Sequence, residues 1–265
     1  MKAGELTLTL LGSGTSTGVP VPGCSCPVCR SVDPLNRRTR CSALLSWRGR
    51  NILIDTATDL RQQALRERLT HIDAVLYTHT HADHVHGIDD LRTFSRSDQP
   101  PLPVFASADS LIVLQRVFAY IFSEPAEPGY RPNLAAWRIG GPFSLFGLPV
   151  LPLELEHGAG TSLGFRFGPL AYLTDCSAIP AAAECQLQGL EVLIIDALRF
   201  RPHQTHFNIA GAIAASRRIG ARRTLLTHLS HEVEHVRDSS GLPAGVELAY
   251  DGQVLTLQLP ALSDG

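Results

Sequence analysis

One segment, residues 78–87, constrains this chain more than any other part of its sequence. It reads Thr-His-Thr-His-Ala-Asp-His-Val-His-Gly and directly follows the apolar, β-rich run 74–77. The end of a strand carries side chains to a sheet edge, where loops commonly build functional sites. Imidazole and carboxylate groups together suit Zn, Mn or Fe, whereas a solvated polar loop would not require this clustering. The segment therefore predicts a metal site at the end of a strand.

The composition indicates a folded chain with a sizeable core. Of 265 residues, 44% are hydrophobic and 18% are charged, which excludes a disordered chain. The net charge of -2 disfavours a protein whose main role is to wrap nucleic acid, because such domains are usually strongly basic. No run of about 18 apolar residues occurs, so we expect no helix that spans a membrane.

The N-terminus and the cysteines indicate where the protein resides. Residues 1–11 alternate leucine with threonine and lack the basic and long apolar regions of a signal peptide, so they predict a strand. Three of the six cysteines, Cys24, Cys26 and Cys29, lie close together. In a cytosolic-looking chain this clustering favours metal binding over disulfides. We expect a cytoplasmic protein.

Apolar strand-like runs and helical spacings are distributed along the whole chain. Strands are expected at 6–11, 43–47, 52–54, 74–77, 150–155, 163–167, 170–173, 192–195, 224–226, 246–249 and 254–257. Helices are expected at 60–69, 111–121 and 209–219, and loops at 100–103 and 124–133. The Asp-Gly pair within 250–253 predicts a hairpin between the last two strands. This order favours an α/β fold of two sheets with helices outside, in a single domain over residues 1–265.

The histidine segment resembles the His-x-His-x-Asp-His signature of the metallo-β-lactamase fold. Further pieces follow in the order of that family: Ile54-Asp55-Thr56, a lone His157, Asp175 and His228. The resemblance implies a four-layer αββα sandwich with two mixed sheets. It also implies the ligands of two metals: His79, His81 and His157 for the first, Asp83, His84 and His228 for the second, with Asp175 as the bridge. Di-iron oxygen-reducing members usually carry Glu where this chain has His81, so hydrolysis is favoured over redox chemistry.

A glycine-rich motif, residues 12–20, leads into the Cys-x-Cys-x-x-Cys cluster, which is one ligand short of tetrahedral zinc. This combination resembles the phosphonate-pathway phosphoribosyl cyclic phosphodiesterases of the same fold. There the fourth ligand is a His just beyond the last active-site His, and here His231 follows His228. The resemblance implies a structural zinc on Cys24, Cys26, Cys29 and His231. Free thiols or a redox pair are the alternative.

The same resemblance implies phosphodiester hydrolysis. Two divalent ions (Zn or Mn) about 3.5–4 Å apart can share a hydroxide and clamp the attacking and leaving oxygens. His206 matches the position of the general acid, and Asp83 is the other catalytic residue that we expect. Asn208 is expected to cap the helix that starts at Ile209, which places His206 near its positive end. Spacing alone does not separate His206 from His203.

The expected substrate is a small cyclic phosphate, such as a ribosyl 1,2-cyclic phosphate or a nucleotide-like one. The alternatives are a tRNA 3′-processing endonuclease or an acyl or thioester hydrolase of the same fold, and a non-enzymatic metal-binding protein. No insertion is long enough for a tRNA-gripping arm, so nucleic acid is disfavoured as a partner despite the arginines at 217, 218, 222 and 223. We expect no membrane partner, and we leave a homodimer open.

Overall fold

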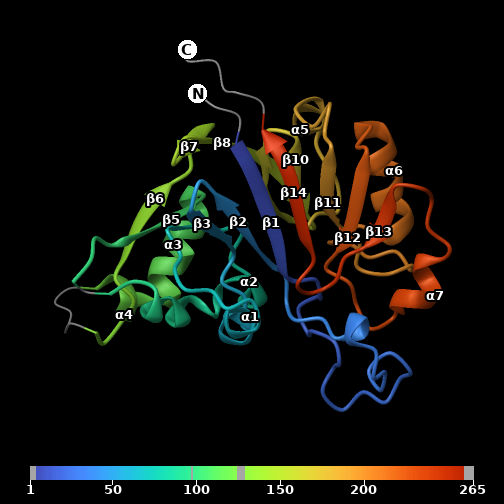
Figure 1. Ribbon diagram of the computed structural model, residues 1–265, viewed down its shortest axis with the longest axis horizontal. Coiled ribbons are helices and arrows are strands. Elements are labelled where there is room, and N and C mark those ends of the chain that lie inside the picture. Colours follow the sequence, from blue (N-terminus) through green and yellow to red (C-terminus); the bar gives the residue numbers. More distant parts are fainter. Residues whose placement is uncertain (1–3, 97, 124–128, 260–265) are drawn as a thin grey trace.

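Two sheets of seven strands face each other in the computed structural model, which describes residues 4–96, 98–123 and 129–259 (Figure 1). The first sheet has the strand order β14-β1-β2-β3-β4-β5-β6. Its strands are β1 (Gly4–Gly12), β2 (Ser42–Trp47), β3 (Arg50–Ile54), β4 (Ala74–Leu76), β5 (Leu102–Ala106), β6 (Leu134–Arg138) and β14 (Val254–Leu259).

The second sheet has the order β13-β12-β11-β10-β9-β8-β7. Its strands are β7 (Phe143–Leu145), β8 (Leu148–His157), β9 (Gly160–Phe167), β10 (Leu170–Leu173), β11 (Val192–Asp196), β12 (Arg223–Thr227) and β13 (Val246–Leu248). Both sheets contain parallel and antiparallel pairs, so both are mixed.

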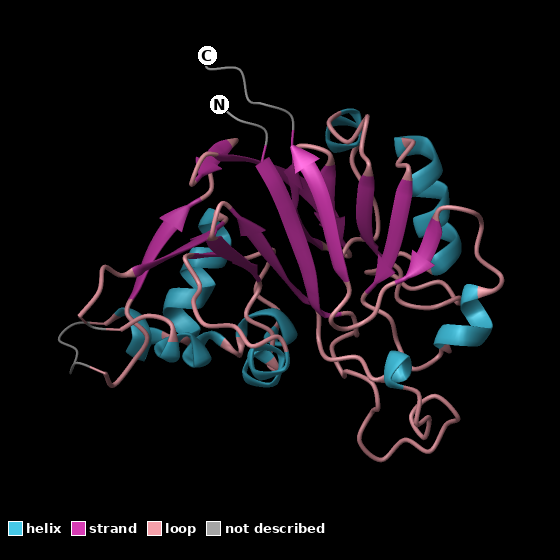
Figure 2. Cartoon of the chain, viewed as in Figure 1, coloured by secondary structure: helices cyan, strands magenta, loops and turns pink. Residues whose placement is uncertain are grey.

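Helices cover the outer face of each sheet (Figure 2). Those beside the first sheet are α1 (Leu60–Arg66), α2 (Ala82–Val85), η2 (Ile88–Thr93), α3 (Ala108–Val117) and α4 (Ala119–Phe122). Those beside the second are α5 (Ala181–Cys185), α6 (Ile209–Ile219) and α7 (His235–Ser239), and the short η1 (Pro34–Asn36) lies in the N-terminal loop. No helix of the described ranges is long and apolar enough to cross a bilayer.

Alternate residues of one strand enter different cores, which is the physical basis of the four layers. In β3, Ile52 belongs to the core between the sheets, whereas Leu53 packs with the helices outside the first sheet. In β11, Ile194 enters the central core, whereas Leu193 packs with the helices outside the second sheet. Each sheet is therefore buried on both faces, and the predicted αββα sandwich is confirmed.

Every expected strand is present, but β5, β6 and β7 were not predicted. The prediction of a loop at residues 100–103 is wrong at its end, because Leu102 and Pro103 begin β5. Pro103 removes one ladder donor, yet buried Leu102 and Val104 flank it and hold the strand between β4 and β6. Of the other expected loop, residues 124–128 lie outside the described residues.

The predicted hairpin between the last two strands is wrong, because they belong to different sheets. β13 pairs with β12, whereas β14 pairs with β1. The Asp-Gly turn is real, with Gly252 at φ 83°. It is held by the segments that follow β1 and precede β2: the Asp251 carboxylate accepts hydrogen bonds from the backbone N–H and hydroxyl groups of Ser13 and Thr39.

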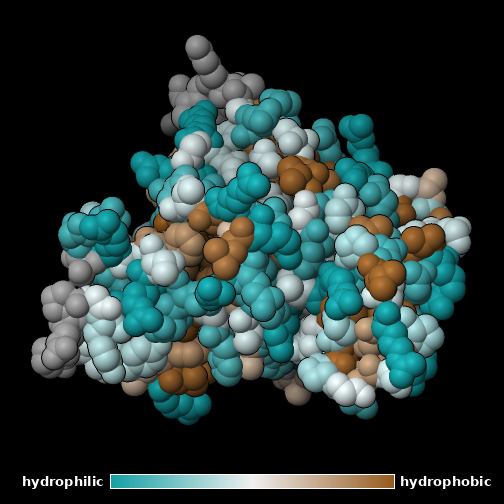
Figure 3. Space-filling view, turned by 60° about the horizontal axis from the view of Figure 1, so that its bottom comes forward, coloured by the Kyte–Doolittle hydropathy of each residue, from teal (hydrophilic) through white to brown (hydrophobic). Residues whose placement is uncertain are grey.

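The C-terminal ends of the central strands meet at one edge of the molecule. β3, β4 and β5 run parallel in the first sheet, and β10, β11 and β12 run parallel in the second. A hydrogen bond of 2.8 Å from Leu163 N to Thr78 O joins the sheets at this edge. The loops after these strands lie at the bottom of Figure 1, and Figure 3 brings that face forward. Its surface is largely hydrophilic, with hydrophobic residues in separate patches.

Candidate metal centre

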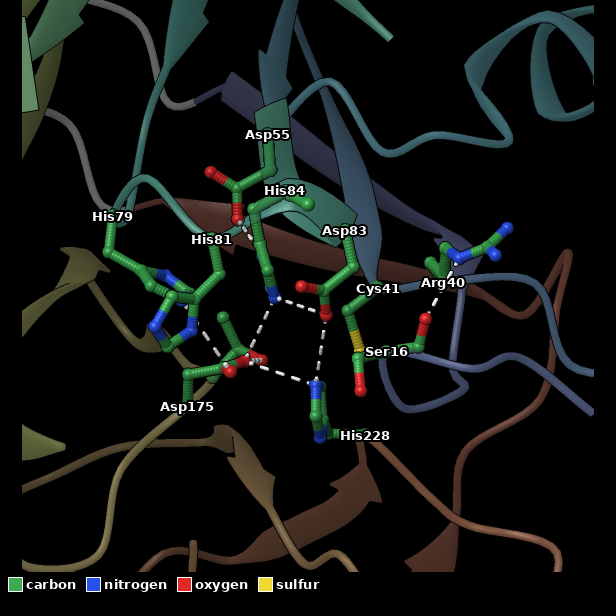
Figure 4. A network of polar contacts seen from close by, with 12 residues as sticks. Ser16, Arg40, Cys41, Asp55, His79, His81, Asp83, His84, Asp175 and His228 are labelled. Atoms are coloured by element: carbon green, nitrogen blue, oxygen red, sulfur yellow. Dashed lines mark hydrogen bonds and ion pairs between the residues drawn. The ribbon is translucent and has the colours of Figure 1, made fainter. Parts of the chain in front are cut away.

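The histidine segment forms the loop after β4 and the first turn of α2, as its position after an apolar run predicts. His81 is the residue before α2, and Asp83 and His84 lie within that helix. His79, Asp83 and His84 are buried, whereas His81 is exposed. One short loop therefore directs several donors into the edge between the sheets (Figure 4).

Asp175 lies between two groups of imidazoles and turns one carboxylate oxygen toward each. Its Oδ2 is 3.7 Å from Nε2 of His79 and 3.7 Å from Nε2 of His157. Its Oδ1 is 3.1 Å from Nε2 of His84 and 3.4 Å from Nε2 of His228. This is the arrangement that a carboxylate shared by two cations requires.

The remaining two expected ligands complete the groups. His81 presents Nδ1 at 3.3 Å from Nε2 of His157. Asp83 Oδ2 lies 3.3 Å from Nε2 of His84 and 3.6 Å from Nε2 of His228. The structure thus brings all seven predicted active-site residues together, in two groups whose donor atoms lie within 4.8 Å of one another.

Buried imidazole nitrogens at this centre have no hydrogen-bond partner among the described residues. They are Nε2 of His79, Nε2 of His84 and both ring nitrogens of His228. The opposite nitrogen of His84 is held at 2.7 Å from Asp55 Oδ2, which fixes the ring and directs Nε2 into the centre. A buried nitrogen without a partner is unfavourable, and coordination of a cation would satisfy it. The donor set therefore fits a divalent metal on each side of Asp175.

The electrostatics of the centre also match a cation. Burial by itself would raise the pKa of the Asp175 carboxyl, but the charges of His228, His84 and His79 hold that pKa well below its usual range. Burial opposes charge on His228, yet Asp175, Asp83 and Asp196 raise its pKa to about 9. The carboxylates of the centre favour a proton on His84 and His228, whereas burial lowers the pKa of His79 and His157.

Three residues of the centre have left-handed backbone conformations, although none is glycine. Asp55, Asp175 and His228 have φ values of 61°, 51° and 60°. Each follows β3, β10 or β12 at the same edge of the molecule. Such conformations are costly for non-glycine residues and persist where the surrounding structure enforces them. Here they turn the side chains from the strand ends into the centre.

His206 lies beside the metal ligands and is held by a buried carboxylate. Its Nδ1 is 2.7 Å from Oδ2 of Asp196, and its ring centroid is 4.7 Å from that of His228. Asn208 caps α6 as predicted, accepting from Gly211 N at 2.8 Å. His203 is more exposed, and its Nδ1 faces the backbone N–H and the hydroxyl of Thr205, with no carboxylate of the described residues paired to it. The structure therefore distinguishes His206 from His203, which their spacing in the sequence does not.

Sequence reasoning missed Asp196. It is fully buried at the end of β11, where it also accepts a hydrogen bond of 3.0 Å from Cys176 N. The signal in the sequence was an acidic residue at the end of an apolar run. Asp175 has the same kind of position, just after the preceding strand. In one sequence, that signal alone does not distinguish Asp196 from an ordinary surface residue after a strand.

The cysteine cluster and His231 form a second group of donors. Nδ1 of His231 lies 3.3, 3.7 and 3.4 Å from Sγ of Cys24, Cys26 and Cys29. Zn–S bonds of about 2.3 Å and Zn–N bonds of about 2.0 Å at tetrahedral angles give S···N separations of about 3.5 Å. The four side chains therefore have the spacing of a closed tetrahedral shell.

Residues 228–231 form the loop that connects the two centres, and hydrogen bonds hold this loop from two sides. Leu229 N donates to Ser13 O in the glycine-rich motif at 2.9 Å. The buried Arg38 guanidinium donates to the carbonyls of Ser230 and Val233 at 3.2 and 2.8 Å. Gly14 cannot carry a side chain here, because a Cβ would lie 2.8 Å from Arg38 O. The glycine-rich motif thus packs against the loop that carries His228.

A cavity of about 580 Å³ opens beside the His79 group. Its walls are the histidine loop, the N-terminal turn of α3 and the turn between β8 and β9. His79, His81 and His157 line it on one side. The cavity is therefore continuous with the metal centre.

The fold and the donors of its centre define the class of protein: a metal-dependent hydrolase. A sequence profile of the β-lactamase superfamily domain matches residues 50–229. The chain belongs to this superfamily, and its fold is the metallo-β-lactamase fold that the histidine segment predicted.

Among solved structures, the chain is similar to a diphosphatase from the PhnP family. The two share 42% sequence identity and a TM-score of 0.92, over 97% of this chain and 99% of the other. It also resembles the zinc-bound PqqB of Methylobacterium extorquens, with a TM-score of 0.76 and 22% identity over 94% of this chain and 99% of that one. The second likeness concerns the fold alone.

The chain is also similar to a protein that is named for a different activity. An octanoyltransferase of Porphyromonas gingivalis is 42% identical over 249 residues, which are 92% of this chain and 50% of that protein. The chain thus spans about half the length of this relative.

Proposed function

We propose that this chain is a two-metal phosphodiesterase that hydrolyses a small phosphodiester, with a ribosyl or nucleotide-like cyclic phosphate as the expected substrate. The observation that carries the proposal is the position of Asp175, whose two oxygens face two separate groups of nitrogen donors. The similarity to a PhnP-family diphosphatase supports chemistry at a phosphate rather than at a β-lactam or thioester.

The proposed ligands of the first metal are His79, His81 and His157, and those of the second are Asp83, His84 and His228, with Asp175 shared between them. Divalent ions (Zn or Mn) bound there would polarise phosphate oxygens and lower the pKa of water. The chain's own residues fix the orientation of the donor atoms. For example, His157 donates its Nδ1–H to Thr205 O at 2.7 Å, so its Nε2 faces the centre with a free lone pair.

His206 is the proposed proton donor to the leaving oxygen. The buried Asp196 accepts from Nδ1 and so leaves Nε2 of His206 directed away from the carboxylate. The rings of His157 and His228 lie 4.9 and 4.7 Å from it, centroid to centroid, so the donor stands at the side of both metal groups. A general acid needs this proximity to the reacting phosphate.

The cysteine cluster is proposed to bind a structural zinc. Three thiolates and one imidazole fill a tetrahedral shell and leave no position for water. The group joins the N-terminal loop to the segment that carries His228, so its expected role is to hold an active-site ligand in place.

Two alternatives find less support. Of the arginines at 217, 218, 222 and 223, three form ion pairs, Arg218 with Glu184, Arg222 with Glu191 and Arg223 with Glu247, which disfavours a nucleic-acid groove there. Octanoyl transfer would need an apolar channel, whereas most of the residues that line the cavity beside the centre carry a hydroxyl, an imidazole or a carboxylate. The name of the relative also describes a protein about twice as long as the matched region.

The test is to assay metal-loaded protein against bis(p-nitrophenyl) phosphate, 2′,3′-cyclic nucleotides, a ribosyl cyclic phosphate, a precursor tRNA and an octanoyl thioester. We expect hydrolysis of the small phosphodiesters that chelation abolishes and Zn or Mn restores. Turnover of the thioester or the tRNA without turnover of any small phosphodiester would contradict the proposal.

A further inference from the structure

Thr78, the residue before His79, connects two of the proposed metal ligands. It lies just after β4 and is almost fully buried. Its hydroxyl oxygen lies 2.7 Å from Asp55 Oδ2 and 3.0 Å from Nδ1 of His79. The same Asp55 oxygen lies 2.7 Å from Nδ1 of His84 (Figure 4). One carboxylate therefore reaches a histidine of each proposed metal group, directly in the second group and through the Thr78 hydroxyl in the first.

The chemistry of these groups fixes the direction of each hydrogen bond. An ionised carboxylate only accepts hydrogen bonds, so Asp55 accepts from the Thr78 hydroxyl and from Nδ1–H of His84. A hydroxyl has a single proton to donate. Because Thr78 donates its proton to Asp55, its oxygen accepts from His79, and Nδ1 of His79 carries a hydrogen. Both histidines are therefore held with a proton on Nδ1 and with Nε2 facing Asp175 in the metal centre.

The surroundings of His79 leave this arrangement without a substitute. Within the described chain, its Nδ1 has a hydrogen-bond partner only in Thr78. Asp55, Thr78, His79 and His84 are at most 5% exposed, so bulk water does not reach their polar atoms. The buried Nε2 atoms of His79 and His84 lack hydrogen-bond partners, which points to a cation as their ligand. In a metal-binding histidine, the hydrogen bond of the other nitrogen orients the ring and selects the tautomer.

We propose that Thr78 is a positioning residue whose hydroxyl orients His79 and fixes its ring proton on Nδ1, so that both metal groups depend on the single carboxylate of Asp55. The inference rests on the metal ligands of the proposed function and adds the hydrogen-bond support that the two groups share. Thr78 acts through His79, because its hydroxyl is engaged with Asp55 and His79 and not with the reacting atoms.

Two backbone contacts hold Thr78 in place independently of its hydroxyl. Its N–H donates to Asp55 Oδ1 at 2.8 Å, and its carbonyl oxygen accepts from Leu163 N at 2.8 Å. Thr78→Val keeps the side-chain shape and both backbone contacts and removes only the hydroxyl. The variant should therefore disconnect His79 from Asp55 and preserve the contact between Asp55 and His84.

The main experiment measures the Co(II) affinity of each metal group by titration against a chromophoric chelator, with the cysteine cluster loaded with zinc beforehand. An Asp83→Ala background isolates the first group, and a His157→Ala background isolates the second. Thr78→Val should weaken the first group about 10- to 100-fold, the usual cost of a lost hydrogen bond to a metal ligand, and the second by less than about threefold. Asp55→Asn should weaken both groups, and Thr78→Ser should bind like the wild type.

A second readout depends on neither metal nor turnover. Long-range ¹H–¹⁵N NMR spectra of the imidazole rings distinguish the two neutral tautomers of histidine. In the metal-free wild type, His79 should carry its proton on Nδ1. In Thr78→Val, a substantial fraction of His79 should carry it on Nε2, and Thr78→Ser should restore the wild-type spectrum. A residue that only stabilises the fold would not change this tautomer.

Thr224→Val is the matched control. Thr224 is also buried, and its hydroxyl lies 2.6 Å from that of Ser216, at the opposite end of β12 from His228. This variant loses one buried hydrogen bond away from the metal centre. It should lower the melting temperature about as much as Thr78→Val and leave the metal affinities and the His79 tautomer unchanged. If Thr78→Val does not fold, Thr78→Ala removes the same hydroxyl without requiring space and should give the same result.

Three outcomes would overturn the inference: an unchanged affinity of the first group in Thr78→Val, an equal loss in both groups, or an unchanged His79 tautomer. A wild-type protein that binds no metal at the centre would overturn the proposed function instead. The expected pattern of affinities in a protein that hydrolyses no phosphodiester would support the role of Thr78 and contradict the proposed substrate class.

Discussion

The two donor clusters of this protein differ in composition, in burial and in access. The histidine–aspartate centre collects residues from the ends of strands in both sheets and borders a cavity of about 580 Å³. The cysteine cluster takes three donors from one short loop and a single His231 from far along the chain, and these four donors would fill a tetrahedral shell. The difference teaches that an accessible site of imidazole and carboxylate donors suits catalysis, whereas a closed thiolate site suits a structural metal.

The clusters nevertheless share a loop. His228 belongs to one and His231 to the other, and Arg38 holds the carbonyl of Ser230 between them. A substitution in the cysteine cluster is therefore expected to lower activity at the histidine–aspartate centre. A substitution in that centre should have little effect on the cysteine cluster. The predictions that follow test this asymmetry.

The largest effect is expected from Asp83→Ala. The change removes one proposed ligand of the second metal, so kcat/KM for bis(p-nitrophenyl) phosphate should fall about 10³-fold or more. The melting temperature should change by less than about 4 °C, and zinc on the cysteine cluster should remain. Steady-state kinetics, thermal unfolding and metal analysis measure these three quantities, with the exposed Asp98→Ala as control. Near-normal turnover at limiting metal would disprove the two-metal assignment.

The next effect is expected from His206→Ala, which removes the proposed proton donor while leaving both clusters intact. Turnover of a cyclic phosphate should fall about 10²–10⁴-fold. The loss should be much smaller for bis(p-nitrophenyl) phosphate, because nitrophenolate leaves without a proton. His203→Ala is the matched control, since its ring lies 5.2 Å from that of His206 but lacks the Asp196 contact. Equal losses for both substrates would show that His206 is not the acid.

Cys26→Ser tests the cysteine cluster. Loss of one thiolate should release zinc under mild chelation and lower the melting temperature by about 10 °C, because this site ties together segments distant in sequence. Turnover should fall less than in the Asp83 variant, and mainly at low metal concentration. The exposed Cys185→Ser should change neither quantity. Wild-type protein that retains no zinc after mild chelation would contradict the assignment.

The smallest effect is expected from Arg38→Met, which leaves every proposed ligand in place. The carbonyl of Val233 loses the Arg38 donor, and that of Ser230 keeps only the backbone N–H of Val233, so the free energy of unfolding should fall by about 1–3 kcal/mol. Because His228 is then less firmly held, kcat/KM should fall about tenfold at limiting metal and recover with excess metal. Exposed Arg37→Met is the control. A loss that added metal does not reverse would assign Arg38 a purely structural role.

The sequence by itself determined the features that depend on local spacing. Two-residue alternation indicated the apolar face of β1, and the continuous apolar runs at 52–54 and 192–195 predicted strands buried on both faces. The histidine segment placed four donors on one loop because they are neighbours in the chain, and Cys24, Cys26 and Cys29 are close for the same reason. The later candidate ligands His157, Asp175 and His228 were predicted only through their order in a family, since each alone is an ordinary polar residue at the end of a strand.

The tertiary structure decided everything that depends on partners distant in sequence. An apolar run shows that a strand is buried but not which strand it pairs with, so β13 and β14, predicted as a hairpin, lie in different sheets. Asp196 and Arg38 acquire their roles only where folding buries them against His206 and Ser230. The physical reason is that hydrophobic burial is nearly non-directional, whereas hydrogen bonds and ion coordination depend on positions that only the packed chain defines.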